Sequence, residues 1–428
     1  MQKSSKKKKE NFLTKAKRKI KKTIRLIGPG FVTGSADDDP SGIGTYSIAG
    51  AKFGLLMLWL VPFLLPLMFV IQEMCARIGL VTGKGLTANM KKFFSKPVLY
   101  SAIFILVVAN VINIGADISI MASSLKLVFG FNVNFWAIFV FILIVLMEIF
   151  ISYRIYSKIL IFLSLFLLAY VVTAFMTSHD FLEIIKYTFI PHFKFTKDFI
   201  LIAIGFFGTT ISPYLFFWQT SHEVEELHGC KKINHSKKTL KDLIRKVRFS
   251  TFVGMFYSQM IALFIVITCY STLHKSGITE INSAAEAAMA LRPLAGDWAF
   301  LIFSIGIIGA GFLGIPVLAG ATAYALSELF NFKASLSYKF KEAKFFYGVI
   351  ALATLVGLFI NFIGVSPIKA LLYAAVVNGI CAIPLIAFII ILANKTEVMG
   401  EHKNKFFSNF IGYITLGLML LSVVIIFM

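Results

Sequence analysis

Long, almost uncharged apolar segments recur along this chain and leave very few folds open to it. A helix that spans a bilayer needs about 20 mostly apolar residues, and about eleven segments of that kind follow one another here. They are 26–51, 54–79, 98–128, 134–153, 157–176, 199–226, 247–273, 297–328, 345–363, 367–393 and 407–427. Because lipid offers the backbone no hydrogen bonds, such segments cross a membrane as helices. The pattern predicts an all-α polytopic membrane protein with the lipid bilayer as its partner.

The composition excludes a soluble domain. Hydrophobic residues make up 58% of the 428 residues and charged residues only 15%, whereas soluble domains carry about 25% charged residues. The sequence contains no HExxH, GxSxG or P-loop motif and no Cys–His cluster. Its four cysteines are scattered, without a CxxC pair, so we interpret them as packed thiols. We therefore expect neither an enzyme nor a bound cofactor.

Basic residues alternate with the apolar segments and predict the orientation. The net charge is +21, and Lys and Arg gather in the N-terminal arm 1–25 and after every even-numbered segment. Cytoplasmic loops of membrane proteins carry such an excess, so we expect a cytoplasmic N-terminus in a bacterial-type inner membrane. We interpret the arm as a tail held near anionic lipid, not as a nucleic-acid-binding segment.

Two of the segments contain helix-breaking motifs. The first reads Asp37-Asp38-Asp39-Pro40-Ser41-Gly42 in its middle, and the sixth reads Gly208-Thr209-Thr210-Ile211-Ser212-Pro213. Proline removes a backbone donor and clashes with the preceding turn, so both motifs should unwind a helix at mid-membrane depth. A break there is tolerated only where it is buried or lines a cavity.

The spacing of the two breaks predicts an internal repeat. They lie five segments apart, and an odd number of helices inverts the second copy relative to the first. We expect inverted halves at about 26–176 and 199–393 within a transporter core 26–393, followed by a loop and an additional eleventh helix in 394–428. Paired broken helices of this kind are the best sequence indication of a transport site.

Three consecutive carboxylates in the first break are the strongest chemical signal. A carboxylate at the bilayer centre costs about 2.5–3.5 kcal/mol, and a bound cation would offset that cost. Asp39, directly before Pro40, is the expected ligand. Asp37 and Asp38 either face water one turn away or cap the second half of the helix. Thr209, Thr210 and Ser212 add hydroxyl groups, so the predicted site is built of oxygens, which suit Mg²⁺, Ca²⁺ and Mn²⁺.

Other polar residues within the segments are weaker candidates. Asp117 and Asn113 lie in the third segment and Asn378 in the tenth, as candidates for the permeation path or for positions just behind the ligands. Asp117 is the best of them: it lines the permeation route, binds protons or makes a helix–helix hydrogen bond. We interpret Glu223, with the two acidic residues that follow it, as a solvated inner rim. The small residues of the eighth segment, GAGFLGIPVLAGATAYALSE, predict close packing against the first segment.

These motifs, with AGAKFG at 49–54 after the first break, resemble the Nramp (natural-resistance-associated macrophage protein) family of divalent metal transporters. The resemblance covers nearly the whole chain. It implies the LeuT-type fold, a 5+5 inverted repeat in which helices 1 and 6 are broken. The metal positions that it implies in this chain are Asp39, Ala36, Gly42, Thr209 and Ser212.

The chain departs from the family's pattern in several places. Gly42 stands where the family has an Asn ligand, Ser212 where it has Met, and Tyr214 where it has His. Asp117 matches one member of an acidic pair, and the paired Arg of the ninth helix is absent. With these changes the chain resembles the divergent Nramp-related magnesium transporter branch, which implies a larger, partly hydrated ion.

The sequence therefore predicts transport of divalent metal cations by alternating access, with Mg²⁺ as the first expectation, Mn²⁺ as a further substrate and little or no proton coupling. A proton-coupled Mn²⁺ or Fe²⁺ transporter of the ordinary Nramp type is the alternative. An amino-acid or organic-cation transporter of the same fold is the second alternative. The sequence gives no oligomeric state.

Overall fold

The computed structural model describes residues 29–151, 162, 165–178, 180–229 and 237–427. The predicted arm 1–25 and the first part of the predicted segment 157–176 lie outside these residues. The α-helices are α2 (Pro29–Asp37), α3 (Pro40–Phe53), α4 (Leu60–Thr82), α5 (Leu86–Phe93), α6 (Lys96–Phe129), α7 (Val133–Phe150), α9 (Leu168–Thr177), α10 (Phe181–Phe189), α11 (Lys197–Thr210), α12 (Pro213–Gly229), α13 (Lys237–Thr272), α14 (Ala284–Ala288), α15 (Arg292–Ala295), α16 (Ala299–Leu329), α17 (Lys344–Ile360), α18 (Pro367–Asn394), α19 (Thr396–Met399) and α20 (Phe406–Phe427). Short 3₁₀ turns are η1 (Leu165–Leu167), η2 (His274–Ser276), η3 (Met289–Leu291), η4 (Gly296–Trp298), η5 (Asn361–Ile363) and η6 (Gly400–His402).

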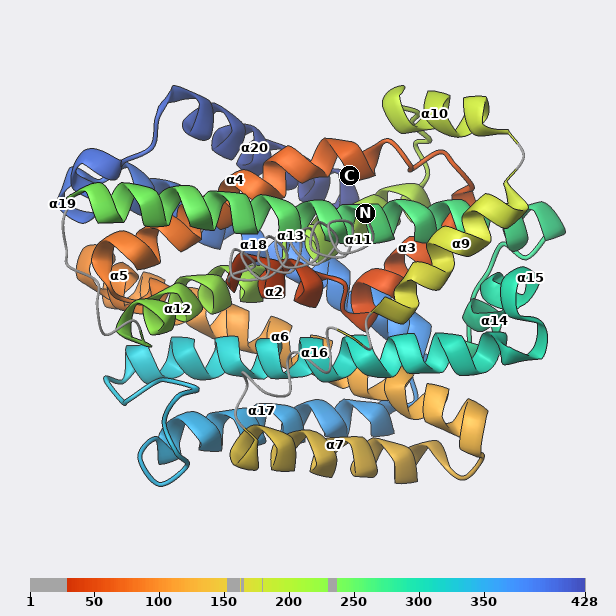
Figure 1. The fold of residues 1–428 in the computed structure, drawn as a ribbon, viewed down its shortest axis with the longest axis horizontal. Helices are drawn as coiled ribbons and strands as arrows, with labels where there is room; N and C mark the ends of the chain where they lie inside the picture. The colour runs from red at the N-terminus through yellow and green to blue at the C-terminus, as the bar shows by residue number, and fades with distance from the viewer. Residues whose placement is uncertain (1–28, 152–161, 163–164, 179, 230–236, 428) are drawn as a thin grey trace, which may run out of the picture.

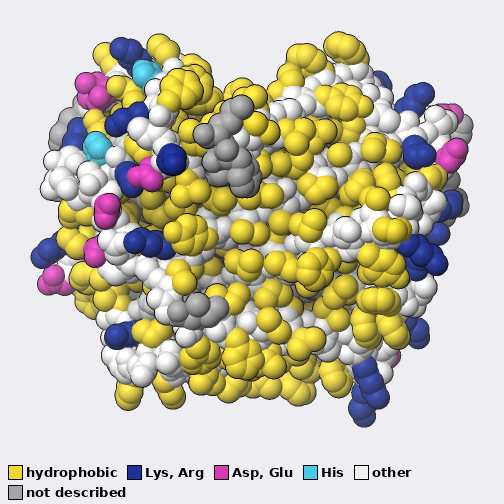
Figure 2. Space-filling view, turned by 180° about the vertical axis from the view of Figure 1, so that it is seen from behind, with side chains coloured by type: hydrophobic (Ala, Val, Ile, Leu, Met, Phe, Trp, Pro, Cys, Tyr) yellow, Lys and Arg dark blue, Asp and Glu magenta, His cyan; other side chains and the backbone are white. Residues whose placement is uncertain are grey.

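The long helices run roughly parallel to the long axis of the molecule (Figure 1). Within the described residues, eight helical segments are long and apolar enough to cross a membrane, and two shorter apolar helices accompany them. Figure 2 shows a broad hydrophobic middle, with most charged side chains gathered toward the two ends. This arrangement matches a bilayer around the middle of the molecule, since charged groups are costly at membrane depth.

Two helices mark the lipid-facing surface. Few residues of α7 and α20 are buried, and their exposed apolar side chains include Phe139 and Leu146 on α7 and Phe410 and Leu421 on α20. An apolar patch of this extent is foreign to a soluble monomer, whereas lipid tails cover it without cost. The predicted all-α polytopic membrane fold is therefore confirmed.

Both predicted helix breaks are present. α2 ends at Asp37 and α3 begins at Pro40, while α11 ends at Thr210 and α12 begins at Pro213. Each second half-helix starts with proline at its first position, where the missing N–H costs nothing. α2 packs against α12 and α3 packs against α11, so the two broken helices lie alongside each other in opposite directions in the middle of the molecule (Figure 1).

Small residues let neighbouring helices approach the first break closely. A β-carbon at Gly34 of α2 would lie 2.2 Å from the carbonyl carbon of Gly254 on α13. On the other side, a β-carbon at Gly314 of α16 would lie 2.9 Å from the β-carbon of Asp39. The predicted packing of the eighth segment against the first is confirmed, and glycine is the residue that permits it.

Candidate metal-binding site

Asp39 occupies the first break and is fully buried. Its backbone is extended, and its side chain caps α3 by accepting a hydrogen bond from the Gly42 amide at 2.9 Å. Ser41 donates its hydroxyl to the same oxygen, Oδ1, at 2.6 Å. The cap satisfies one of the amides that a helix start leaves without a partner. Capping of this half-helix was one of the two alternatives that the sequence left open for Asp37 and Asp38. In the structure Asp39, directly before Pro40, takes that role.

The second oxygen of Asp39 faces two other helices. Asn113 of α6 donates its Nδ2 to Oδ2 at 3.0 Å, and the hydroxyl of Tyr214 on α12 lies 3.3 Å from the same oxygen. The Tyr214 hydroxyl also donates to the backbone carbonyl of Ala36 at 3.0 Å. It therefore lies between two oxygens that were predicted as ligands. With four donors around it, this buried carboxylate is held in one position by three helices.

The second break brings neutral oxygens close to the first. A β-carbon at Gly42 would lie 3.0 Å from the Thr209 hydroxyl and 3.4 Å from the Asp37 carbonyl, so these groups meet at Gly42. The buried Thr209 hydroxyl has no hydrogen-bond partner among the described residues. α2 and α11 both end here, and the negative end of a helix favours a cation.

Ser212 lies in the second break, but its hydroxyl is engaged with its own helix. It lies 2.6 Å from the carbonyl oxygen of Thr209 and 3.0 Å from that of Gly208, and it donates to them. These are carbonyls that the break releases from the helical ladder. Ser212 thus stabilises the end of α11, and its side chain is not directed at Asp39 in this conformation.

Asp117 lies one helical turn after Asn113 and is fully buried. Among the described residues neither of its carboxylate oxygens accepts a well-formed hydrogen bond, and the backbone amide of Ser41 is a polar neighbour. One of these oxygens would lie 3.8 Å from a β-carbon at Gly314, the residue that touches Asp39. The structure therefore places Asp117 beside the first break.

Asp37 and Asp38 form a separate pair. The Ser258 hydroxyl of α13 lies 2.7 Å from Asp37 Oδ2 and 3.0 Å from Asp38 Oδ1. Both carboxylates are buried, so the expectation that they face water is wrong for this conformation. One hydroxyl has one proton for two acceptors, and the outer oxygen of each carboxylate has no partner among the described residues.

Two predicted route residues lie away from Asp39. Glu223 is near the far end of α12, where the side-chain amide of Gln219 lies 3.4 Å from it. It is only 2% exposed, so the predicted solvated rim is wrong for Glu223. Asn378 is buried on α18, and no described residue bonds to its amide. Its neighbour Gly379 lies against Gly208 of α11, which puts Asn378 beside the second broken helix.

The chemistry of the site follows from its charge and donor set. In the described part of the chain, no three His, Cys, Asp or Glu side chains converge closely enough to hold a metal ion. The ion pairs found there lie elsewhere, as Lys52–Asp198, Arg77–Glu73 and Arg248–Glu73. A cation at Asp39 would therefore meet one carboxylate and neutral oxygens, which is the donor set of hard divalent ions.

Sequence reasoning named Asn113 only among the weaker candidates and did not name Ser258. The sequence carries a signal that favours Asn113, because residues four apart share one face of a helix and Asp117 follows it by four. Ser258 carries no such signal. It is an ordinary hydroxyl in an apolar helix, and only the packing of α13 along α2 places it against the two carboxylates.

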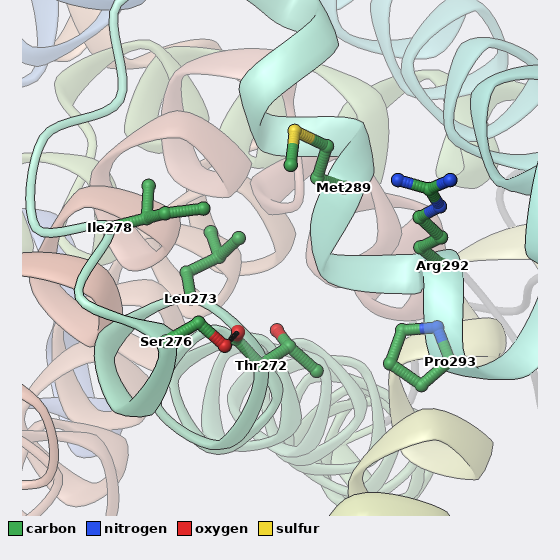
Figure 3. A pocket seen from close by; sticks show the side chains of 7 residues that line it. All are labelled: Thr272, Leu273, Ser276, Ile278, Met289, Arg292 and Pro293. Atoms are coloured by element: carbon green, nitrogen blue, oxygen red, sulfur yellow. Dashed lines mark hydrogen bonds between the residues drawn. The ribbon is translucent and has the colours of Figure 1, made fainter.

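The cavity shown in Figure 3 is a different feature. It has a volume of about 360 Å³ and is lined by none of the predicted ligands. The end of α13 with Thr272, Leu273 and Ser276 bounds one side, and Met289 and Arg292 of the following turns bound the other (Figure 3). It lies at an end of the long helices, where the connection between α13 and α16 folds back.

The fold and the paired breaks define a class: a multi-pass helical membrane protein of the LeuT type, a 5+5 inverted repeat whose first and sixth helices are broken. Comparison with known families agrees. The family model described as Natural resistance-associated macrophage protein-like matches residues 30–428. The chain belongs to the Nramp family.

Individual proteins show how far the likeness extends. The divalent metal cation transporter MntH of Klebsiella pneumoniae is 25% identical over 412 residues, which cover 94% of this chain and 93% of that protein. MntH of Erwinia tasmaniensis is 26% identical over 69% of this chain and 70% of its own.

Solved structures show the same fold at low identity. The Eremococcus coleocola manganese transporter superposes with a TM-score of 0.79 at 15% identity, over 94% of this chain and 86% of that one. Mhp1, a nucleobase-cation-symport-1 family transporter, gives a TM-score of 0.59 at 15% identity, over 93% of this chain and 92% of its own. Both likenesses concern the architecture of the helices alone.

Proposed function

We propose that this protein transports divalent metal cations across a membrane, with Asp39 as the charged ligand of the transported ion. The observation that carries the proposal is the buried Asp39 carboxylate in a broken helix, beside the Ala36 carbonyl and without a basic partner among the described residues. A carboxylate in such a place is unfavourable unless a cation or a proton offsets its charge.

Manganese is the first candidate for the ion. Relatives that cover most of the chain are named as divalent metal cation transporters, and the structural neighbour is named as a manganese transporter. Oxygen ligands suit Mn²⁺ as well as Mg²⁺, so the absence of sulfur in the breaks is compatible with manganese. This support favours the Mn²⁺ alternative over the Mg²⁺ uptake that we expected first from the sequence.

Coupling to protons belongs to the same proposal. Asp117, and the Asp37–Asp38 pair on Ser258, leave carboxylate oxygens without hydrogen-bond partners in the described interior. Protons can neutralise such groups during a transport cycle and leave again at the other side. From the sequence we expected little or no proton coupling, because Tyr214 stands where the family has His and the Arg pair is absent. That expectation did not consider the carboxylates of Asp37, Asp38 and Asp117.

Magnesium transport is the second candidate, and one feature favours it. The groups around Asp39 are hydroxyl, amide and carbonyl groups, so Asp39 supplies one carboxylate among neutral groups. Mg²⁺ is commonly held by one or two carboxylates and several waters.

We further propose that the protein lies in an inner membrane with its N-terminus in the cytoplasm, on the basis of the Lys and Arg distribution.

The test is ion flux into liposomes that contain the purified full chain. We expect uptake of Mn²⁺, and a pH-sensitive dye in the lumen should report acidification in proportion to the metal carried. Mg²⁺ and Ca²⁺ are measured in parallel, and Asp297→Asn, a change at an exposed residue, is the control. Absence of flux for all three ions would overturn the proposal, and flux of Mg²⁺ without Mn²⁺ would establish the second candidate in its place.

A further inference from the structure

Asn113 faces the Asp39 carboxylate from α6 with only half of its amide in use. Nδ2 donates to Asp39 Oδ2 at 3.0 Å, while Oδ1 accepts no hydrogen bond from the described residues. The side chain is 0% exposed. Buried amide oxygens are nearly always paired, because they lose their water on burial. An unpaired one next to a buried carboxylate therefore calls for a partner that arrives with the transported ion.

The spacing of the two side chains fits one shared cation. Mg²⁺ binds oxygens in an octahedron at about 2.0–2.1 Å, so two neighbouring ligand atoms stand about 3 Å apart. Mn²⁺ takes oxygen ligands in the same geometry. The observed 3.0 Å between Asn113 Nδ2 and Asp39 Oδ2 equals that edge. If the amide turns over, its oxygen takes the place of the nitrogen and both groups become adjacent ligands.

Such a turn requires little rearrangement. The terminal torsion of asparagine has two broad positions half a turn apart, and the amide oxygen and nitrogen are nearly equal in size. Without a cation, the N–H faces the carboxylate because the carboxylate accepts it. With a cation on Oδ2, the N–H would face a positive charge and the carbonyl end is preferred.

We propose that Asn113 is a specificity-determining ligand of the transported ion, and that its amide turns over when the ion binds at Asp39. The inference rests on the proposed function, since it assumes a divalent cation at Asp39. It adds a ligand from α6, a helix outside the two broken ones. Ion binding would then tie α6 to α3, and a hard amide oxygen in the shell would favour Mn²⁺ and Mg²⁺ over Cd²⁺.

Two variants of matched shape test the proposal. Asn113→Leu and Asn113→Met have similar volume and differ in the sulfur of Met. Binding of Mn²⁺ and Cd²⁺ to the purified full chain is measured by calorimetry. We expect Asn113→Leu to weaken Mn²⁺ binding about 10- to 100-fold. We expect Asn113→Met to raise the Cd²⁺ preference over Mn²⁺ at least about 10-fold relative to Asn113→Leu, because a soft ligand then faces the ion.

The control is Asn110→Leu, three residues earlier on α6. Asn110 is equally buried, but its amide donates to the Leu318 carbonyl and the Thr322 hydroxyl of α16 and not to Asp39. Asn110→Leu should leave the Mn²⁺/Cd²⁺ preference unchanged, and a shift as large as that of Asn113→Met would overturn the proposal. Thermal unfolding of all three variants checks that the chain is folded.

The Asn113 and Asp39 variants together distinguish a failure of the Asn113 ligand role from a failure of the proposed metal site. Equal Cd²⁺/Mn²⁺ ratios for the Met and Leu variants, with both ions bound, would overturn the ligand role and reduce Asn113 to a residue that positions Asp39. If Asp39→Asn binds Mn²⁺ like the wild type, the proposed site itself fails. If Asp39→Asn loses Mn²⁺ and the Met/Leu ratios still agree, the inference alone fails.

Discussion

The two broken helices share a backbone design and differ in what they place at the break. In both, the first half ends three residues before a proline and the second half begins on that proline. The first break carries Asp39, whose charge is surrounded by donors from α3, α6 and α12. The second carries Ser212, whose hydroxyl bonds back to its own helix.

This difference shows that the two halves of an inverted repeat can contribute different groups to one site. The break itself frees backbone carbonyls on both sides, so either half can offer neutral oxygens. Only the first break adds carboxylates. Asp39 is the one that meets donors from three helices, whereas Asp37 and Asp38 share the Ser258 hydroxyl of α13. We expect substitutions at the first break to act on ion binding and those at the second to act mainly on helix stability.

The largest effect should follow from Asp39→Asn. Asparagine caps helices about as well as aspartate, so the start of α3 is preserved while the charge is removed. We expect Mn²⁺ uptake into liposomes to fall to background, with little change in the unfolding temperature of the purified protein. Uptake near the wild-type rate in a folded Asp39→Asn protein would place the ion elsewhere.

Tyr214→Phe should have the next largest effect, in the opposite direction. The hydroxyl lies between the Ala36 carbonyl and Asp39 Oδ2 and competes with an ion for both. A hydrogen bond of this kind contributes about 1 kcal/mol, so its loss should tighten Mn²⁺ binding about fivefold in calorimetry. Weaker binding by Tyr214→Phe would instead mean that the hydroxyl holds the bound ion.

Thr209→Val tests whether the second break contributes a side chain. Valine has the shape of threonine without its hydroxyl, and this hydroxyl has no partner in the described structure. Removing an unpaired buried hydroxyl should not lower the unfolding temperature. A ligand role predicts that Mn²⁺ affinity falls about threefold, as for the loss of one neutral hydrogen-bonding group. An unchanged affinity would mean that, of the two breaks, only the first contributes a side chain to ion binding.

The smallest effect on binding should come from Ser212→Ala. Its hydroxyl stabilises the carbonyls at the end of α11, so we expect about 1 kcal/mol less stability and Mn²⁺ affinity within about twofold of the wild type. Chemical unfolding and calorimetry measure the two quantities on the same sample. If Ser212→Ala lost Mn²⁺ affinity as Asp39→Asn does, the contrast between the two breaks would disappear.

Features set by local sequence were predictable because their physics is local. An apolar run of about 20 residues has to span the bilayer as a helix, and proline within such a run interrupts it. The segments, both breaks, the Asp39 position and the family resemblance could therefore be identified from the chain alone. The approach of the eighth segment to the first also followed, since glycine-rich faces allow helices to pack closely.

Which side of each helix meets the breaks was decided by tertiary packing. The sequence left Asp37 and Asp38 either near water or capping the helix and did not name Ser258. In the structure α13 lies close to α2 at Gly34, and both carboxylates meet Ser258. Asn113 ranked below Asp117 in the sequence, yet α6 directs its amide at Asp39. The rotation of a helix about its axis depends on contacts with residues far away in the chain, so no local pattern encodes it. The sequence by itself determined a membrane protein with two broken helices and a carboxylate in one of them, and only the folded structure decided which side chains surround that carboxylate.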